Sequence, residues 1–342
     1  MDKILTVIIP TYNGGEKLKW SLGQLLPLAK KVEDRVSVLV NDNCSTDNTE
    51  EIVREFAFQY KGLLNYHRQS ENIGADRNYF DGAARSTTKY VCIMGDDDII
   101  TPSYFDAIFG ILQEYPELAY INYNMMDITY AGKFLDIRDK HTNSQYYRNG
   151  MDFVKDHLET PSLITSNVFL REPFLEVYHS TSHLDYPGYN WFYCMLKSII
   201  HSPCYYVGFP IAMDGKPEGG LGWKKLYPLY FLYGMGRIFK ELSTNNQNLY
   251  DAWIERQFKP GNNNMEFLIR IVSKNKDFYE GDNFNKIYAY VETEFYKQRF
   301  RWAASCSHRM YELRTSPYSL FCWYCYKLLY PIRWIAKKII IR

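Results

Sequence analysis

The sequence lacks the features that mark several large classes of protein. No uninterrupted apolar stretch reaches the length needed to span a bilayer. The first residues, MDKILTVIIPTYN, include a proline and an asparagine before the apolar region of a signal peptide could finish. No GxGxxG and no GxxxxGK[ST] follows an expected strand, so the common dinucleotide-binding and P-loop patterns are excluded. The net charge is only +1, and bulk charge therefore identifies no partner.

Cysteine does not form a usable framework either. The seven cysteines are scattered and odd in number, which predicts free thiols in a reducing compartment. Cys322 and Cys325 have CxxC spacing, but no second CxxC or nearby histidine completes a zinc site. No βαβ pattern precedes them, as it would in a thioredoxin-like protein. We therefore expect neither metal binding nor redox chemistry at this pair.

Apolar runs and helical periodicities alternate through the first third of the chain. The expected strands cover residues 4–9, 36–40, 63–66, 90–94 and 118–123. The expected helices cover residues 16–30, a segment starting at Asp47 with Glu50 three residues later, 76–86 and 103–114. Strands that alternate with helices predict an α/β fold whose mostly parallel sheet is covered by helices on both faces.

The pattern weakens after residue 125 and divides the rest of the chain in two. Residues 126–225 mix short helical and strand-like runs and end in a glycine-rich loop over residues 214–225. Residues 226–342 contain two stretches with helical character, 226–257 and 286–313. We therefore expect three regions, 1–125, 126–225 and 226–342, of which the last is a helical extension.

The C-terminal residues 314–342 combine basic and aromatic side chains. This segment contains no acidic residue, and its arginines and lysines alternate with tryptophan, tyrosine and leucine. Such a mixture suits a helix that lies in the membrane interface. The alternative is a helix docked on the core with its basic residues in solvent. Because the basic residues gather among interfacial aromatics, we expect no binding to nucleic acid.

Polar clusters follow three of the expected strands. They are PTYN at residues 10–13, NDNCSTD at residues 41–47 and GDDD at residues 95–98. In open α/β sheets, ligands bind beyond the carboxyl ends of the strands. The three clusters, far apart in sequence, are therefore predicted to converge in one crevice.

The run GDDDII at residues 95–100 is the most informative of these clusters. Asp96, Asp97 and Asp98 repel one another, and folding gains nothing from that repulsion. Oxygen ligands in this number suit a divalent cation such as Mg²⁺ or Mn²⁺. The alternative is an acidic turn, or an N-cap for the helix after Pro102.

Four segments together resemble a known family. TVIIPTYNGG, VLVNDNCSTDNTEEIV, ENIGADRNYF and YVCIMGDDDIITP occur in the order and spacing of family 2 glycosyltransferases with the GT-A fold. ENIGADRNYF and GDDDIITP look most like bacterial O-antigen and capsule enzymes of the abequosyltransferase-like group. The resemblance covers about residues 3–125 and fades beyond, where the acceptor is normally recognised.

This resemblance implies a reaction and a location. The enzyme would transfer a sugar from a UDP-, dTDP- or CDP-linked donor to a hydroxyl of a lipid-linked or growing glycan, with inversion. It would use Mn²⁺ or Mg²⁺ and act in the cytoplasm at the inner face of the cell membrane. Residues 1–125 would then bind the donor, and residues 126–225 would bind the acceptor.

The resemblance also assigns roles to the aspartate run. Asp97 matches the family's metal-binding aspartate, and Asp98 is expected to orient the site and share the metal. Asp96 is expected near the ribose or the metal. The family often has another aspartate where Gly95 stands. This departure leaves open which neighbour shares the metal with Asp97.

Positions after the first two strands match those that hold the nucleotide. Asp42 matches the acidic residue that reads the base, since a carboxylate accepts a hydrogen bond from an imide N–H. Its alternative role is to cap its own turn. Pro10, Tyr12 and Asn13 match positions around the base. Tyr12 could instead be an ordinary core aromatic.

Arg77 matches the family's basic residue in the asparagine-glycine segment. Its guanidinium suits phosphate geometry, so we expect it at the diphosphate or the base. The alternative is a surface ion pair with Asp76 or Asp81 on the same helix.

The reaction also needs a base that takes the proton of the acceptor hydroxyl. Asp185, just before an expected helix, matches an acidic position of the family and is our candidate. Its alternative role is a helix N-cap or a turn. Asp214 and Glu218 are weaker candidates on a loop that could close over the donor or simply be a surface loop. His183 could assist.

Two other functions compete with sugar transfer. A sugar nucleotidyltransferase shares the α/β core, but its glycine-rich first loop with arginine and lysine differs from PTYNGGEKLKW at residues 10–20. A non-catalytic nucleotide-binding component of a polysaccharide assembly complex would bind the same ligands without turnover. The intact acidic motifs favour the enzyme.

Overall fold

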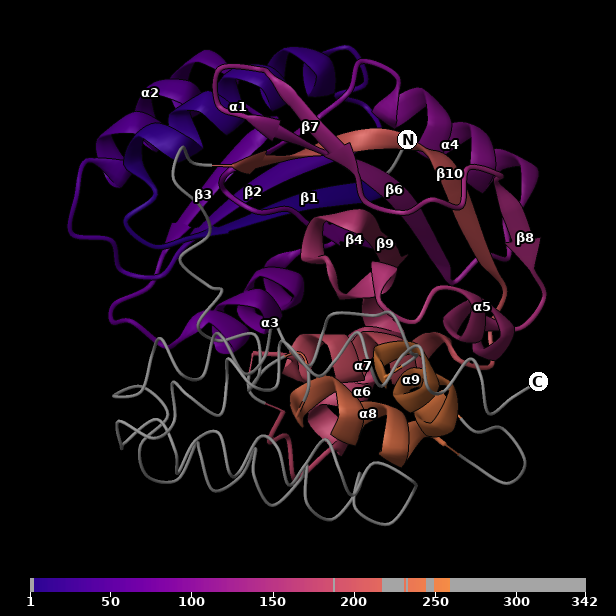
Figure 1. Ribbon diagram of the computed structural model, residues 1–342. Helices are drawn as coiled ribbons and strands as arrows, with labels where there is room; N and C mark the ends of the chain where they lie inside the picture. The colour runs from indigo at the N-terminus through magenta and orange to yellow at the C-terminus, as the bar shows by residue number, and fades with distance from the viewer. Residues whose placement is uncertain (1–2, 187, 217–230, 232, 244–248, 259–342) are drawn as a thin grey trace, which may run out of the picture. The chain divides into compact units, whose positions relative to one another are not determined.

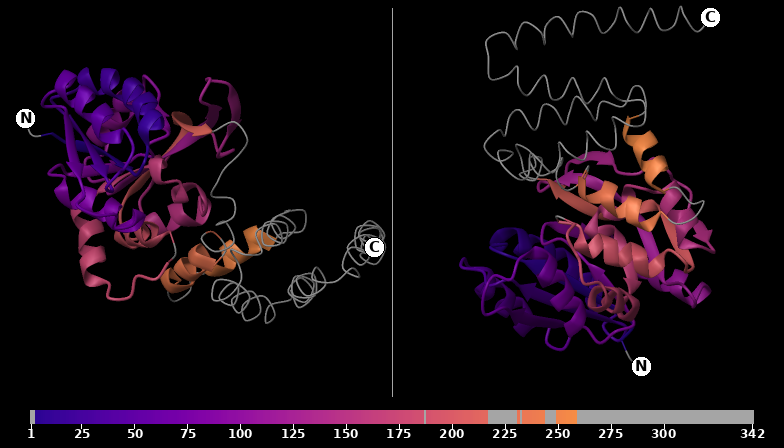
Figure 2. Two further views of the ribbon diagram at one scale, coloured as in Figure 1. Left: turned by 90° about the vertical axis from the view of Figure 1, so that its left-hand side faces the viewer. Right: turned by 90° about the horizontal axis from the view of Figure 1, so that it is seen from below.

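The chain divides into two compact units, which are described separately. The first contains residues 1–221 and 238–252, and the second contains residues 222–237 and 253–342. The computed structural model of the 342-residue chain (Figures 1 and 2) describes residues 3–186, 188–216, 231, 233–243 and 249–258. The sheet and the site belong entirely to the first unit.

The first half of the sheet is parallel. Its four strands lie in the order β3-β2-β1-β4, and their bounds are β1 Leu5–Thr11, β2 Val36–Asp42, β3 Leu64–Arg68 and β4 Tyr90–Ile93. Strand β1 pairs with β2 and β4, with Ile8 opposite both Leu39 and Ile93. All three pairings are parallel, so the carboxyl ends meet at one edge. This half matches the arrangement expected from the alternating pattern.

The second half of the sheet is mixed, and the order continues β9-β6-β10-β5. The bounds are β5 Asp98–Ile100, β6 Tyr120–Thr129, β7 Phe134–Ile137, β8 Gln145–Tyr147, β9 Asn167–Leu170 and β10 Cys204–Lys216. Strand β9 lies antiparallel between β4 and β6, and β10 lies parallel to β6 and antiparallel to β5. The sheet therefore combines strands from residues 1–125 with strands from residues 126–216. The three predicted regions stay a prediction.

Helices cover both faces of the sheet. The bounds are α1 Gly15–Lys30, α2 Thr49–Gln59, α3 Ala75–Arg85, α4 Tyr104–Glu114, α5 Gly150–Asp156, α6 Arg171–Ser180, α7 Asn190–Ile199, α8 Met235–Leu242 and α9 Leu249–Phe258. Two short 3₁₀ turns, Thr160–Ser162 and Ile164–Ser166, precede β9. In Figure 1, α1, α2 and α4 lie above the sheet, and α3, α6 and α7 lie below it.

Helix α1 shows how the apolar pattern places an element. Its residues Leu18, Leu22, Leu25 and Leu26 recur at helical spacing, and all four are fully buried in the core. The start of α2 differs from the prediction by two residues. Asp47 does not form a capping box, and its carboxylate instead accepts hydrogen bonds from the backbone N–H and hydroxyl of Thr49.

Some expectations fall on residues outside this description. They are the helix over 286–313, the basic C-terminal segment 314–342, the Cys322 and Cys325 pair, and Glu218. None of the helices within the described ranges is both long enough and apolar enough to cross a membrane. The four cysteines in these ranges, Cys44, Cys92, Cys194 and Cys204, are free thiols.

Two helical glycines provide a test of the packing. A Cβ at Gly82 in α3 would lie 2.6 Å from Cγ2 of Ile8, which is fully buried in β1. A Cβ at Gly23 in α1 would meet nothing within 4 Å. We expect Gly82→Ala to lower the free energy of unfolding by about 1–3 kcal/mol through overpacking. The matched Gly23→Ala should raise it by about 0.5–1 kcal/mol, because alanine favours the helix.

Urea denaturation followed by circular dichroism measures both changes. A Gly82→Ala variant as stable as the Gly23→Ala variant would contradict the close packing of α3 on β1.

Candidate active site

The first polar loop and the aspartate run meet at the carboxyl edge of the parallel strands. The hydroxyl of Thr11, at the end of β1, donates to Asp96 Oδ2 over 2.7 Å. Lys17 Nζ, in the first turns of α1, lies 3.3 Å from Asp96 Oδ1. A Cβ at Gly14 would lie 2.2 Å from the Thr11 hydroxyl and 2.5 Å from Asp96 Oδ2. Glycine is therefore needed where the loop passes over Asp96.

Asp98 is fixed from the second half of the chain. Thr165, in the turn before β9, accepts a hydrogen bond from the Gly95 backbone N–H over 2.9 Å and donates its hydroxyl to Asp98 Oδ2. Ser21 of α1 donates to the Asp98 carbonyl over 2.7 Å. A Cβ at Gly95 would lie 2.8 Å from Asp98 Oδ2, so an aspartate at this position would displace Asp98. This contact gives a physical reason for the glycine that departs from the family pattern.

Asp97 is the member of the run whose ionised form is least favourable in the folded chain. Burial, together with the nearby carboxylates of Asp96 and Asp214, raises the pKa of Asp97 to about 6, although Lys17 opposes the shift. Burial lowers the pKa of Lys17, but Asp96 and Asp97 outweigh it and leave that pKa raised. A divalent cation beside Asp97 would relieve the same repulsion that Lys17 offsets in part.

Strand β10 closes this side of the site. Asp214 lies opposite Asp98 in the sheet and forms an ion pair with Arg138, which also pairs with Asp127. A Cβ at Gly215 would lie only 2.2 Å from the Asp97 carbonyl oxygen. Asp214 is therefore part of the sheet, in contrast to the predicted loop over residues 214–225, and it contributes negative potential to Asp97.

The second polar loop is organised by Asp42, whose side chain is fully buried. Asp42 Oδ1 accepts from the Ser45 backbone N–H over 2.8 Å and from the Ser45 hydroxyl, and Oδ2 accepts from the Tyr66 hydroxyl over 2.8 Å. Arg68 Nε lies 3.7 Å from Oδ2. Asp42 therefore caps its own turn, which is the alternative role that the sequence suggested. Recognition of a base by Asp42 stays a prediction.

Asn13 joins the first two loops. It adopts a positive φ of 52°, which asparagine tolerates better than most residues. Its backbone N–H donates to the Ser45 hydroxyl over 2.9 Å, and its side-chain oxygen accepts from the Thr46 N–H over 2.8 Å. Pro10 pairs with Asn41 in the sheet. Tyr12 is 48% exposed, which excludes the alternative that it is a core aromatic.

Arg77 is exposed in the first turn of α3 and forms no ion pair with any described residue. Asp76 accepts from Asn190 Nδ2 over 3.0 Å, and Asp81 pairs with Arg85 over 2.7 Å. The alternative of a surface ion pair is therefore wrong, and the guanidinium of Arg77 remains available to a ligand.

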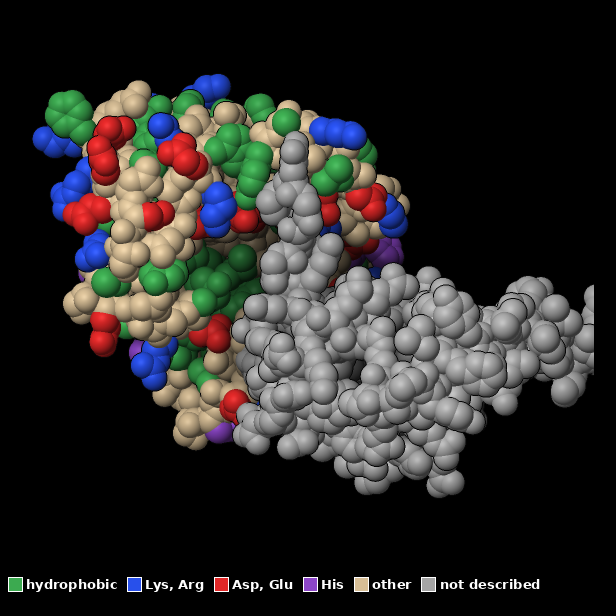
Figure 3. Space-filling model, turned by 60° about the vertical axis from the view of Figure 1, so that its left-hand side comes forward, with side chains coloured by type: hydrophobic (Ala, Val, Ile, Leu, Met, Phe, Trp, Pro, Cys, Tyr) green, Lys and Arg blue, Asp and Glu red, His purple; other side chains and the backbone are tan. Residues whose placement is uncertain are grey.

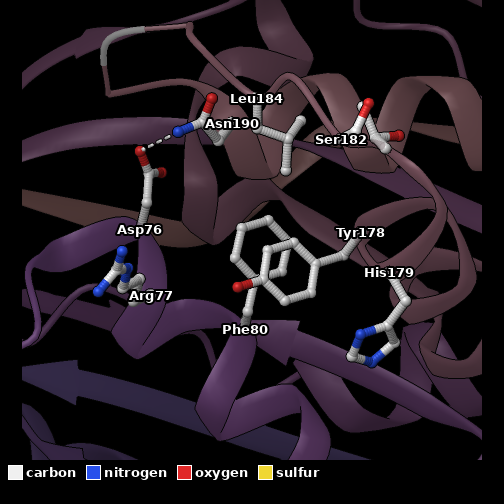
Figure 4. Close-up of a pocket in the computed structure, with 9 residues that line it drawn as sticks. Asp76, Arg77, Phe80, Tyr178, His179, Ser182, Leu184 and Asn190 are labelled. Atoms are coloured by element: carbon white, nitrogen blue, oxygen red, sulfur yellow. Dashed lines mark hydrogen bonds between the residues drawn. The ribbon is translucent and has the colours of Figure 1, made fainter.

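A pocket of about 420 Å³ lies beside Arg77 (Figure 4), between α3, α6 and the segment before α7. The rings of Phe80 and Tyr178 stack within it, with centroids 3.8 Å apart. Polar groups line its rim: Asp76, Arg77, His179, Thr181, Ser182 and Asn190. The pocket therefore offers an aromatic surface edged by hydrogen-bonding groups.

Asp185 is exposed and lies in an irregular segment. It directly follows Leu184, which lines the pocket. Helix α7 begins at Asn190, five residues later, so Asp185 is not its N-cap. Asn190 Oδ1 accepts from the Tyr186 N–H over 2.9 Å, while its amide donates to Asp76. This bridge ties the segment of Asp185 to α3.

Asp76 is a half-buried group that the sequence did not single out as functional. Burial raises its pKa to about 6, and hydrogen bonds from Trp191 and Asn190 at the start of α7 oppose the shift. His183, expected as an assistant of Asp185, lies 3.6 Å from Glu241. Figure 3 shows acidic and basic side chains interspersed over the described part of one face, in agreement with the balanced charge.

Comparison with protein families identifies the chain. A family model described as glycosyl transferase family 2 matches residues 6–176, which contain both polar loops, the aspartate run and Thr165. The chain belongs to glycosyltransferase family 2. This membership confirms the resemblance carried by the four ordered segments.

Curated relatives of this family 2 chain match about a third of its length. The abequosyltransferase RfbV of Salmonella typhimurium is 33% identical over 112 residues, which cover 33% of this chain and 32% of the relative. The poly(ribitol-phosphate) beta-N-acetylglucosaminyltransferase TarP of Staphylococcus aureus is 32% identical over 115 residues, 33% of this chain and 34% of the relative. The chain thus spans about a third of the length of such relatives.

Solved structures extend the likeness to most of the family 2 chain. Staphylococcus aureus TarS residues 1–349 superpose with a TM-score of 0.59 at 13% identity, covering 90% of this chain and 89% of that one. The mannosyltransferase PcManGT of Pyrobaculum calidifontis, solved with GDP-Man and Mn²⁺, gives a TM-score of 0.54 at 15% identity, covering 89% and 85%. These likenesses confirm the GT-A fold.

Several residues of this site carry little signal in the sequence. Thr11 and Lys17 lie inside or next to the motif PTYNGG and could be found from that position. Thr165 and Asn190 are ordinary polar residues in weakly patterned segments. Their roles depend on contacts with Asp98 and Asp76, which are far away in sequence.

The strained carboxylate gives a stability test. The folded-state pKa of Asp97, about 6, exceeds its ordinary value of 3.8, so the ionised form destabilises the folded chain above pH 6. We expect Asp97→Asn to raise the free energy of unfolding at pH 7 in EDTA by about 1–3 kcal/mol. The gain should shrink as the pH falls from 6 towards 4, because the wild-type carboxyl then becomes protonated in the folded state.

Urea denaturation at pH 7 and pH 5 measures this effect, with the exposed Asp106→Asn as control. A loss of stability in Asp97→Asn at pH 7 would show that the carboxylate is well accommodated without a cation.

Proposed function

We propose that this chain is a metal-dependent, inverting glycosyltransferase that uses a nucleotide-sugar donor. The convergence of Asp96, Asp97 and Asp98 with the two polar loops at one edge of the sheet carries this proposal. Family membership supports sugar transfer, and the GT-A fold supports a donor site at this edge.

The carboxylates fit a divalent cation. Asp97 presents a half-buried carboxylate with a raised pKa, whereas both oxygens of Asp96 are already held by Thr11 and Lys17. We assign Asp97 as the principal ligand and Asp98 as its neighbour, with Mn²⁺ or Mg²⁺ as the ion. When bound, the ion would neutralise charge on the leaving nucleoside diphosphate. Lys17 would add a second positive group beside the diphosphate.

The two polar loops would hold the nucleoside. Tyr12 offers an exposed ring for stacking, and Asn13 fixes the loop that contains Asp42. Solved neighbours are described in complex with UDP, UDP-GlcNAc and GDP-Man, which supports a nucleotide-sugar partner. We expect a pyrimidine nucleotide, and the imide N–H of uracil or thymine suits Asp42.

The acceptor would enter beside α3 and α7. Asp185 would take the proton of the attacking hydroxyl, and the bridge from Asp76 through Asn190 would position its segment. The aromatic pocket beside Arg77 has the character of a sugar-binding surface, with a ring platform and a polar rim. Such a pocket suits a glycan rather than a small apolar ligand.

We further propose that the acceptor is a lipid-linked or growing glycan of a bacterial surface polysaccharide. Two named relatives, an abequosyltransferase and a poly(ribitol-phosphate) beta-N-acetylglucosaminyltransferase, support this proposal. A cytoplasmic enzyme at the inner face of the membrane would meet this acceptor, and the basic aromatic segment 314–342 would provide the contact.

The donor site is tested by calorimetric titration with UDP, dTDP, CDP and GDP, each with and without Mn²⁺. We expect one nucleotide to bind only with metal, and Asp97→Ala to weaken its binding at least about tenfold through loss of the ligand. Asp106→Asn, which removes an exposed carboxylate of α4, should bind like wild type. Equal affinity with and without Mn²⁺ would count against the metal assignment.

The base is tested separately with the donor class found by titration. Release of nucleoside diphosphate is followed with an organic extract of bacterial membranes as the acceptor source. We expect Asp185→Asn to reduce the rate by about 10²–10⁴ while nucleotide binding stays unchanged. A rate like that of Asp106→Asn would remove Asp185 from the role of base.

A further inference from the structure

We propose that Asp139, His141 and His157 form a zinc site separate from the donor site. Asp139 follows β7, His141 lies in the loop before β8, and His157 ends α5. One ligand atom from each residue lies within 4.8 Å of the others. All three belong to the first unit, and neither family membership nor the proposed transfer reaction requires them.

The ligand atoms converge on one carboxylate. Asp139 Oδ1 lies 2.7 Å from His141 Nδ1, and Asp139 Oδ2 lies 3.1 Å from His157 Nδ1. Both imidazoles thus turn the same nitrogen towards Asp139 at hydrogen-bond distance. Zinc–nitrogen bonds of about 2.0–2.1 Å place tetrahedral ligand atoms roughly 3.3 Å apart, so bound zinc would move these atoms apart by at most about 0.6 Å.

The hydrogen bonds around His157 favour a positive charge between His157 and Asp139. The Tyr147 hydroxyl donates its only proton to Asp156 Oδ2 over 3.1 Å. In this arrangement the hydroxyl accepts from His157 Nε2, 3.1 Å away, and Nε2 carries the ring proton. In the neutral ring, Nδ1 is then unprotonated and carries a lone pair that can only accept a hydrogen bond or bind a cation.

This lone pair faces an oxygen of Asp139 that also only accepts. Asp139 receives hydrogen bonds from the His141 backbone N–H over 2.9 Å and from the Thr160 hydroxyl over 2.9 Å, which favour its ionised form. Two acceptors in contact inside the protein are unfavourable unless a cation lies between them. A zinc ion bound to Nδ1 and to the carboxylate satisfies both.

The surroundings are those of a supported metal site. Metal-bound histidines usually donate their second ring N–H to a partner that fixes the ring, which is the role of Tyr147 here. His157 also packs against the Tyr206 ring at 3.9 Å. Asn124 holds the Asp139 backbone through both its amide and its oxygen.

Two of the three side chains are buried and the third is exposed. The side chains of Asp139 and His157 are only 6% and 3% exposed, whereas that of His141 is 59% exposed. A fourth ligand, such as water, can therefore approach from the side of His141. Two nitrogens and one carboxylate favour zinc over magnesium or calcium. Bound zinc would fasten the loop after β7 to α5 in the half of the sheet that contains β6 and β10.

The experiment measures metal in the full chain without an affinity tag. Protein stripped with EDTA is reloaded with ZnCl₂, passed over a desalting column and analysed by plasma mass spectrometry. An Asp97→Asn background removes the donor-site ligand, so that failure of the proposed function does not affect the count. We expect about one zinc per chain in this background, held by the three protein ligands.

His141→Ala is the decisive variant, because the exposed ring can be removed without opening the core. Its zinc content should fall at least about tenfold, and the exposed His201→Ala should keep the full content. Replacement of zinc by Co²⁺ should give the visible absorption of a tetrahedral site, which His141→Ala should lose.

Two results would overturn the proposal. One is a folded chain that holds no zinc after loading, with nitrogen NMR showing both ring nitrogens of His157 protonated, since a proton would then supply the charge. The other is a zinc content in His141→Ala equal to that of His201→Ala.

Discussion

Repulsion among three adjacent aspartates after β4 is the constraint around which this site is built. Folding keeps the run in place by fixing its outer members and leaving the middle one strained. Asp96 is held by Thr11 and Lys17, and Asp98 is held by Thr165. The strain is concentrated at Asp97, whose pKa is raised to about 6. A carboxylate held in this state would gain by binding a cation, which supports the metal role that we propose for Asp97.

The sheet explains how residues from both halves reach this run. The parallel strands bring the loops after β1 and β2 to one edge, and β9 then joins β4 to β6. The turn that contains Thr165 immediately precedes β9, and β10 returns beside β5 with Asp214 opposite Asp98. The aspartate run is therefore enclosed by elements from the N-terminal motifs and from the weakly patterned region.

Two hydrogen-bonded clusters connect segments in the second half of the chain, and they lie at different places. Asn190 links the Asp185 segment to Asp76 on α3, so that the candidate base and the donor side share one rigid connection. The Asp139 cluster fastens the loop after β7 to α5. Both rely on hydrogen-bonded polar side chains, several of them buried or half-buried, which favour a single arrangement because an unmatched partner is costly.

The sequence by itself determined the α/β class, the expected strands and helices of the first third, and the convergence of the three polar loops. Those follow from local periodicity and from motifs at strand ends, as in α1 and the aspartate run. Only the tertiary structure decided the partners of these motifs, including Thr165 for Asp98 and Asn190 for Asp76. It also placed Asp214 in β10 rather than in a loop. Such contacts join residues far apart in sequence, and no short-range pattern records them.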